Sequence, residues 1–161
     1  MSLLSAQSVA RIDELRRTEP TAQCALLTAL RLMQRERRQI GVAEVEEIAG
    51  LLGLSAASVD GVARFYDQFS REPTGRRIVS VCRGIACYLR GAEERAGQIG
   101  RALGVRPGET TADGRLTLHL VECIGDCDHA PAVMLDDAFL GVVTPEGLRA
   151  LLEQAPTDGG G

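Results

Sequence analysis

Four of the five cysteines in this chain form two close pairs in its second half. Four residues separate Cys82 from Cys87, and three separate Cys123 from Cys127. Two short loops that each offer two thiolates can converge on one metal centre from separate parts of a fold. Because thiols in a reducing cytosol stay free or bind metal, the spacing predicts a metal site rather than a pair of disulfides.

Three kinds of chemistry could use four cysteines placed in this way. A structural zinc site favours pairs separated by roughly two to four residues, and the first pair lies at the upper edge of that range. A thiol–disulfide exchange site needs a Cys-x-x-Cys spacing with one lowered thiol pKa, and neither pair has that spacing. A 2Fe-2S cluster needs four thiolates on a wider core, which a Cys-x4-Cys pair followed by a second pair can span. The spacing favours the iron–sulfur cluster and leaves zinc open.

One glycine lies inside each cysteine pair. Gly84 and Gly125 would permit the positive φ and the close backbone approach that wrapping an anionic cluster requires, although each alone is equally compatible with an ordinary loop. Cys87 is expected where a strand passes into a helix. Unpaired backbone N–H groups at that point could then donate hydrogen bonds to thiolate or sulfide.

The first half of the chain is predicted to be helical. Apolar residues recur at helical spacing over residues 5–17, 22–38 and 43–52, and Ser55 is expected to cap a further helix that runs to Phe69. Four side chains are expected on the inner face of that helix: Val59, Val62, Ala63 and Phe65. Residues 1–74 are therefore predicted to form a helical bundle.

The pattern changes after a linker at residues 71–75. Strands are predicted at residues 77–81 and 116–121, a helix at 88–103, a hairpin from 132–135 and 138–142, and a helix from Thr144 to about Glu153. This order, β-α-β and then β-β-α, is thioredoxin-like. The predicted class is α+β, with a helical bundle followed by a thioredoxin-like α/β domain at residues 75–155. Residues 156–161 are expected to be a disordered tail.

Composition limits the class of protein. The formal net charge is −4 and the pI is near 5.2, which argues against nucleic acid as a partner because nucleic-acid surfaces carry a basic patch. No apolar run approaches the ~20 residues that cross a bilayer. We therefore expect no direct insertion into a membrane and a cytoplasmic location.

Residues 45–64 nevertheless have the shape of a helix-turn-helix, whose second helix would start near Ser55. An iron–sulfur transcription regulator is thus an alternative of another class. The charges oppose it, because the would-be recognition helix offers Asp60 and only Arg64, and three glutamates lie just before it.

Three further side chains could be mistaken for site residues or for strained ones. Cys24 stands alone among Ala and Leu on a predicted helix and is expected to be a buried apolar thiol, not a ligand. His129 follows the last cysteine, but a Rieske-type site needs two histidines, and His119 alternates with apolar residues in a predicted strand. Pro131 precedes a predicted strand, where thioredoxin-like folds often hold a cis-proline. The sequence does not decide between a cis and a trans peptide bond at this proline.

Several segments of the chain resemble one family. They are residues 61–69 (Gly-Val-Ala-Arg-Phe-Tyr-Asp-Gln-Phe), residues 73–82 (Pro-Thr-Gly-Arg-Arg-Ile-Val-Ser-Val-Cys) and above all residues 121–131 (Val-Glu-Cys-Ile-Gly-Asp-Cys-Asp-His-Ala-Pro). These segments resemble the small 2Fe-2S subunit of NADH:quinone oxidoreductase, respiratory complex I. The similarity continues through residues 108–118 and 140–148. The same type of subunit occurs in NAD-reducing hydrogenases and NAD-dependent formate dehydrogenases, so the resemblance leaves the parent complex open.

The resemblance implies a helical bundle joined to a thioredoxin-like ferredoxin domain that holds one 2Fe-2S cluster. By position, Cys82, Cys87, Cys123 and Cys127 match the family's four cluster ligands. It also implies an electron partner, the NADH-oxidising flavin subunit, which would hold FMN and NAD.

This chain has no Gly-rich dinucleotide fingerprint and no P-loop, so we expect it to carry electrons within a larger oxidoreductase without binding NADH itself. The complex would lie in the cytoplasm or at the cytoplasmic face of the membrane. A zinc-stapled structural subunit stays an alternative.

Overall fold

The computed structural model describes residues 2–154 and divides the chain into two compact units. The first unit is Met1–Pro73 and the second is Thr74–Gly161. The tail expected at residues 156–161 lies outside the described residues. Each unit has its own hydrophobic core, so each is described here by itself.

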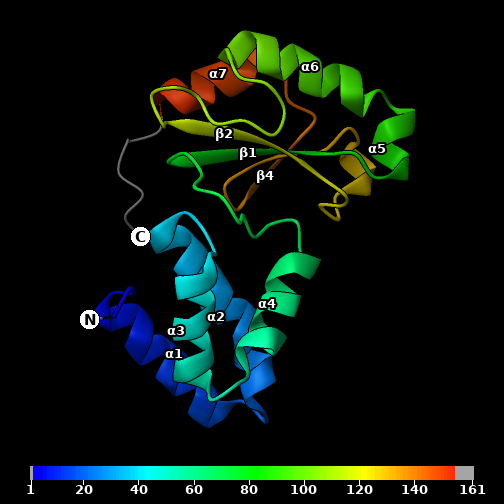
Figure 1. Cartoon of the computed structure of the whole chain (residues 1–161). Coiled ribbons are helices and arrows are strands. Elements are labelled where there is room, and N and C mark those ends of the chain that lie inside the picture. The colour runs from blue at the N-terminus through cyan, green and yellow to red at the C-terminus, as the bar shows by residue number, and fades with distance from the viewer. Residues whose placement is uncertain (1, 155–161) are drawn as a thin grey trace. The chain divides into compact units, whose positions relative to one another are not determined.

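The described part of the first unit is a helical bundle (Figure 1). It contains α1 (Ala6–Thr18), α2 (Ala22–Arg37), α3 (Val42–Leu52) and α4 (Ala56–Phe65). The first three helices confirm the segments predicted from apolar periodicity. Their inward faces and that of α4 meet in a fully buried cluster formed by Ile12, Leu30, Met33, Ile48 and Val59.

The prediction for α4 was wrong at its C-terminal end. The helix ends at Phe65 and not at Phe69, and Phe65 is 78% exposed. The reason is geometric: six positions after the buried Val59, a helix of ~3.6 residues per turn has turned Phe65 roughly 120° away from the inner face. Val59 and Ala63 do face the core, as predicted, and Phe69, beyond the helix, supplies the buried aromatic ring.

A four-stranded sheet forms the centre of the second unit, in the order β2-β1-β3-β4. Strand β1 (Arg77–Cys82) runs parallel to β2 (Leu116–Val121) and antiparallel to β3 (Val133–Leu135), which pairs with β4 (Ala138–Gly141). Helices α6 (Ala92–Leu103) and α7 (Pro145–Gln154) lie together on one face of this sheet (Figure 1). Six fully buried side chains join the two layers: Val79, Val81, Ile99, Leu118, Val133 and Leu148. The α+β class and the thioredoxin-like order of elements are therefore confirmed.

The single helix predicted over residues 88–103 is in fact two. A short helix, α5 (Ile85–Leu89), begins earlier than expected, and α6 starts only at Ala92. Gly91 lies between them in the left-handed region, with φ +82°. Because glycine adopts this conformation without steric cost, it ends one helix and redirects the chain into the next. The result is a separate short element directly after the first cysteine.

The last helix begins as the sequence predicts. The hydroxyl oxygen of Thr144 accepts a hydrogen bond from the N–H of Gly147 at 3.0 Å, which is an N-cap ahead of Pro145. Among the described residues no single helix is long and apolar enough to cross a membrane. Only α3 and α4 taken together reach that length and composition, with a bend of 120° between them.

Candidate metal centre

The register of β1 and β2 brings both cysteine pairs to one end of the sheet. The strands are parallel, and Cys82 at the end of β1 pairs with Val121 at the end of β2. The N–H of Arg83 continues the ladder by donating to the carbonyl of Val121 at 2.9 Å. Both cysteine loops therefore leave the sheet at the same edge, as expected of segments that follow parallel strands.

The first pair is buried. Cys82 is the last residue of β1, and Cys87 lies on α5 with its side chain turned inward and 1% exposed. The backbone of Ala132 makes hydrogen bonds to both cysteines. Its N–H donates to the Cys87 sulfur at 3.5 Å, and its carbonyl accepts from the Cys82 N–H at 3.1 Å. The segment before β3 thus holds the two cysteines against the sheet.

The second pair is exposed. Cys123 lies in the loop after β2, and Cys127 opens a short 3-10 turn, Cys127–His129. Asp126 and His129 are joined across this turn, with 2.7 Å between the Asp126 carboxylate and Nδ1 of His129. That hydrogen bond and the negative charge of Asp126 raise the pKa of His129 above 6.5. The Asp126–His129 pair thus bridges this loop at its surface, and both cysteines of the loop are exposed.

Both Gly84 and Gly125 were expected to combine a positive φ with a close backbone approach, and each shows only one of these properties. Gly84 has φ −57°, so the prediction of a positive φ was wrong there. A Cβ atom at Gly84 would nevertheless lie only 2.7 Å from the carbonyl oxygen of Glu122 and 3.6 Å from the Cys82 sulfur, so the close approach is real. Gly125 shows the reverse, with φ +90° and nothing within 4 Å of the added carbon. Gly84 permits contact between the loops, and Gly125 permits a turn.

The electrostatics link three of the four thiols. Burial raises the pKa of the Cys87 thiol, and Cys82 and Cys127 raise it further, while the Ala132 N–H acts in the opposite direction. Thiols whose charges affect one another in this way lie in a shared environment. Because metals bind thiolates, ligation at Cys87 must be accompanied by loss of its proton.

Among the described residues, no three or more Cys, His, Asp or Glu side chains stand ready-made as a metal site. Two of the four thiols are buried and two are exposed. The chemistry of the donors nevertheless fits an iron–sulfur cluster. Such a cluster needs four thiolates, and the chain offers four free thiols in the two loops. The N–H of Ala132 donates to one of the sulfurs, and the backbone at Gly84 approaches Glu122 so closely that no side chain fits there.

Comparison with known proteins gives the family. Residues 12–156 match the model of the thioredoxin-like [2Fe-2S] ferredoxins. The chain belongs to this family. The recognition made from the cysteine segments is thereby confirmed, and so is the iron–sulfur class of cofactor that the family carries.

Named relatives of this ferredoxin are subunits of NADH-quinone oxidoreductases. It is 44% identical to the E subunit of NADH-quinone oxidoreductase from Pseudomonas aeruginosa over 131 residues, which are 81% of this chain and 79% of the relative. It is 36% identical to the protein of the same name from Escherichia coli over 132 residues, covering 82% and 80%. Subunit 2 of the Thermus thermophilus enzyme is 39% identical over 131 residues, covering 81% and 72%.

A solved structure shares the fold of this ferredoxin. It is that of an NAD+-reducing [NiFe]-hydrogenase in the H2-reduced state, with a TM-score of 0.63 and 25% identity. The match covers 83% of this chain but only 23% of the hydrogenase chain. This ferredoxin thus corresponds to about a quarter of that longer protein.

Other residues singled out from the sequence lie apart from the cysteine loops or make no metal-binding set with them. Cys24 is exposed, so the expectation of a buried thiol was wrong; it lies in the first turn of α2, with its sulfur 3.4 Å from the Thr21 hydroxyl. The neighbouring Ala25 and Leu26 fill the core instead. His119 lies within β2. The Ala130–Pro131 peptide bond is cis, which decides the outcome left open above.

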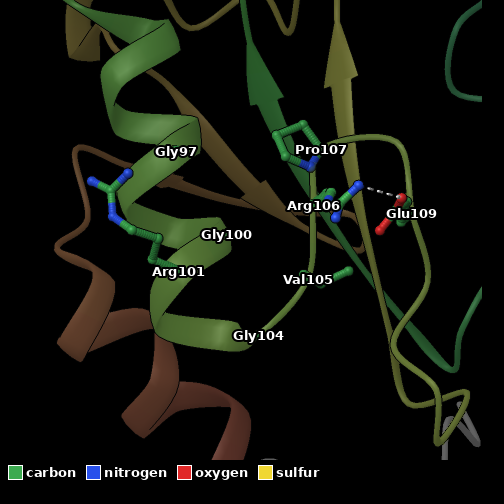
Figure 2. A pocket seen from close by; sticks show the side chains of 8 residues that line it. All are labelled: Gly97, Gly100, Arg101, Gly104, Val105, Arg106, Pro107 and Glu109. Carbon is green, nitrogen blue, oxygen red and sulfur yellow. Dashed lines mark ion pairs between the residues drawn. The ribbon is translucent and has the colours of Figure 1, made fainter.

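The surface hollows among the described residues of the second unit include the following two. The first, of about 400 Å³, lies between α6 and residues 105–109, and Figure 2 shows Arg106 and Glu109 paired on one of its walls and Arg101 pointing away on the other. No cysteine lines it.

The second, of about 490 Å³, borders the second cysteine loop and is lined by Gly125, Asp126, His129, Phe139, Leu140 and Gly141. Sequence reasoning missed this neighbourhood and the role of Ala132, because backbone contacts leave no mark in the pattern of side chains.

Proposed function

We propose that this chain is the electron-transfer subunit of an NADH:quinone oxidoreductase of the complex I type, with one 2Fe-2S cluster held by Cys82, Cys87, Cys123 and Cys127. The observation that carries the proposal is the register of β1 and β2, which starts both cysteine loops at the same end of the sheet. The cluster would supply a one-electron change while its ligands stay in place.

The residues of the chain have distinct parts in this role. Burial of Cys82 and Cys87 would keep water from one side of the centre, and the Ala132 N–H would stabilise negative charge on the Cys87 sulfur. Gly84 lets the first loop approach the backbone at Glu122. The exposed loop with Cys123 and Cys127 would close over the buried pair.

The electron partner that we propose is the NADH-oxidising flavin subunit, which would hold FMN and NAD. A 2Fe-2S cluster takes one electron at a time and the sequence has no dinucleotide fingerprint, so the two-electron oxidation of NADH would belong to a flavin. The complex would lie in the cytoplasm or at the cytoplasmic face of the membrane.

A second candidate is the equivalent subunit of an NAD-reducing hydrogenase or an NAD-dependent formate dehydrogenase. The fold shared with the NAD+-reducing [NiFe]-hydrogenase favours this alternative, whereas the named sequence relatives favour the quinone-linked enzyme. The candidates predict the same cluster and differ in the acceptor that the whole complex reduces.

The test is the iron and acid-labile sulfide content of anaerobically purified protein, together with its EPR spectrum after dithionite reduction. About two iron and two sulfide per chain, with one spin-half signal, are expected of a 2Fe-2S carrier. One zinc and no sulfide, in protein made with ample iron, would establish a structural zinc site instead.

A further inference from the structure

Helix α5 presents an uncharged and mostly apolar face to solvent. Its five residues, Ile-Ala-Cys-Tyr-Leu, include no charged side chain. Ile85 is 82% exposed, Tyr88 58% and Leu89 78%, and their i, i+3, i+4 spacing places them on one side of the helix. We name these three side chains the α5 patch. Large exposed apolar side chains gathered in this way mark a surface that another molecule covers.

The opposite side of the same short helix holds Cys87. The cysteine is buried and the α5 patch is exposed, so the two lie on opposite faces of the same short helix. Backbone hydrogen bonds hold this helix: the N–H of Tyr88 donates to the carbonyl of Gly84 at 2.8 Å, and the N–H of Arg90 donates to the carbonyl of Cys87 at 3.1 Å. Gly91 then directs the chain away into α6. The patch is therefore a fixed part of the wall of the candidate centre.

Charges at the two ends of α5 narrow the choice of occupant. Arg83 before the helix is paired with the carboxylate of Glu122. Arg90 after it is exposed, and within residues 2–154 its side chain has no acceptor or carboxylate partner. An apolar patch that ends in an unpaired guanidinium is complementary to a protein face whose apolar centre is bordered by a carboxylate.

We propose that the α5 patch and Arg90 form the docking surface for the protein that exchanges electrons with this chain. The inference rests on the function proposed above and adds the place of contact. The rate of electron tunnelling falls steeply with distance, so a partner that exchanges electrons quickly must bind close to a cluster ligand. The α5 patch meets this condition, because it backs directly on Cys87.

The test uses the full chain with its cluster and the NADH-oxidising flavin subunit of its complex, co-expressed and then measured for affinity. The double variant Ile85→Ser/Leu89→Ser removes exposed apolar groups and leaves the buried side of α5 unchanged. We expect it to bind the flavin subunit at least roughly tenfold more weakly, with unchanged iron content and visible spectrum. Arg90→Glu should weaken binding as well, and more so at low salt.

Leu151→Ser is the matched control. Leu151 is also apolar and 41% exposed, but it lies on α7 of the same unit, apart from α5 (Figure 1), so its loss should leave the affinity unchanged. Wild-type binding that both α5 variants retain in full would overturn the docking surface and leave the proposed function standing. Wild-type protein that has its cluster but does not bind the flavin subunit would instead overturn the proposed function.

Two other occupants are tested with the same proteins. Sedimentation of the wild-type chain should show a monomer, and the chain should not float with anionic vesicles. Self-association or vesicle binding that is lost in Ile85→Ser/Leu89→Ser, while affinity for the flavin subunit stays intact, would assign the patch to a second copy or to lipid and overturn the proposal.

Discussion

The backbone N–H of Ala132 donates a hydrogen bond to the sulfur of Cys87, a residue 45 positions earlier in the chain. The carbonyl of Ala132 accepts from the N–H of Cys82. A single peptide segment thus holds both buried cysteines. Among the described residues Ala132 makes no such bond to Cys123 or Cys127, so the buried pair is the half of the candidate centre that the backbone before β3 fixes.

Removal of any one of the four paired cysteines should remove the cluster. We expect Cys82→Ala, Cys87→Ala, Cys123→Ala and Cys127→Ala each to lower iron and sulfide per chain by roughly tenfold or more, because with three thiolates one iron lacks one of its two protein ligands. Cys24→Ala is the control and should keep full iron, since that thiol lies in the first turn of α2. Full occupancy in any of the four variants would exclude that cysteine as a ligand.

Gly84→Ala should disrupt the meeting of the two loops. The added carbon would lie 2.7 Å from the backbone oxygen of Glu122, which cannot move as a side-chain end can. We expect a loss of about 1–3 kcal/mol in the free energy of unfolding, measured by urea titration, together with lower iron content.

The control for Gly84→Ala is Gly50→Ala. Gly50 lies inside α3 with nothing within 4 Å of an added carbon. Alanine there should stabilise the protein by about 0.5–1 kcal/mol, because glycine is the poorer helix former. Two variants with equal effects would show that contact at Gly84 is not the cause.

Glu44 stabilises the start of α3. This buried carboxylate accepts from the N–H of Gly41 at 2.9 Å and lies 3.6 Å from the guanidinium of Arg37. Glu44→Ala would leave the N–H without its acceptor and should cost about 1–3 kcal/mol by thermal or urea unfolding. Glu46→Ala, an exposed neighbour on the same helix, should change stability by less than about 0.5 kcal/mol. A similar cost for both would point to loss of charge and not to loss of the cap.

The pairing of α1 with the end of α2 should depend on pH through Glu36. Burial acts to raise the pKa of Glu36, but hydrogen bonds from Ser8 and Ser5 outweigh it and hold the pKa below its ordinary value of 4.5. A lowered folded pKa gives a contribution that is fully present above pH 4.5 and is lost as pH falls through the folded pKa.

Urea titrations of wild type and Glu36→Gln will check this. Wild type should be the more stable near pH 7, and the difference should shrink as the pH is lowered below 4.5. A difference that stays constant over this range would mean that the carboxylate acts through its shape and not through its charge.

Much of the fold follows from local patterns. Apolar periodicity located α1, α2 and α3, and alternation located β1 and β2, because both patterns reflect burial on one face. The errors fall where geometry beyond the local pattern decides. The position of Phe65 depends on where α4 stops, and the break at Gly91 depends on a left-handed backbone conformation.

The candidate site shows the same division. Cysteine spacing is visible in the sequence, so all four thiols could be singled out. The contacts of Ala132 and Gly84 could not, because they are made by backbone atoms or by the absence of a side chain. The unequal burial of the two pairs likewise depends on α5, a helix too short to produce a periodic signal.

The pairing of Cys82 with Val121 also limits which changes of chain length the protein can accept. Deleting one residue from β2 would shift the second cysteine loop by ~3.4 Å and turn the side chains of the shifted part of the strand to the other face of the sheet. The preceding segment, residues 107–114, is itself bound to β2, since the N–H of Gly108 donates to the carbonyl of Leu118 at 2.7 Å and the N–H of Leu118 donates to the carbonyl of Glu109 at 3.1 Å. Insertions and deletions should therefore be absent from β1 and β2 among chains that keep the centre.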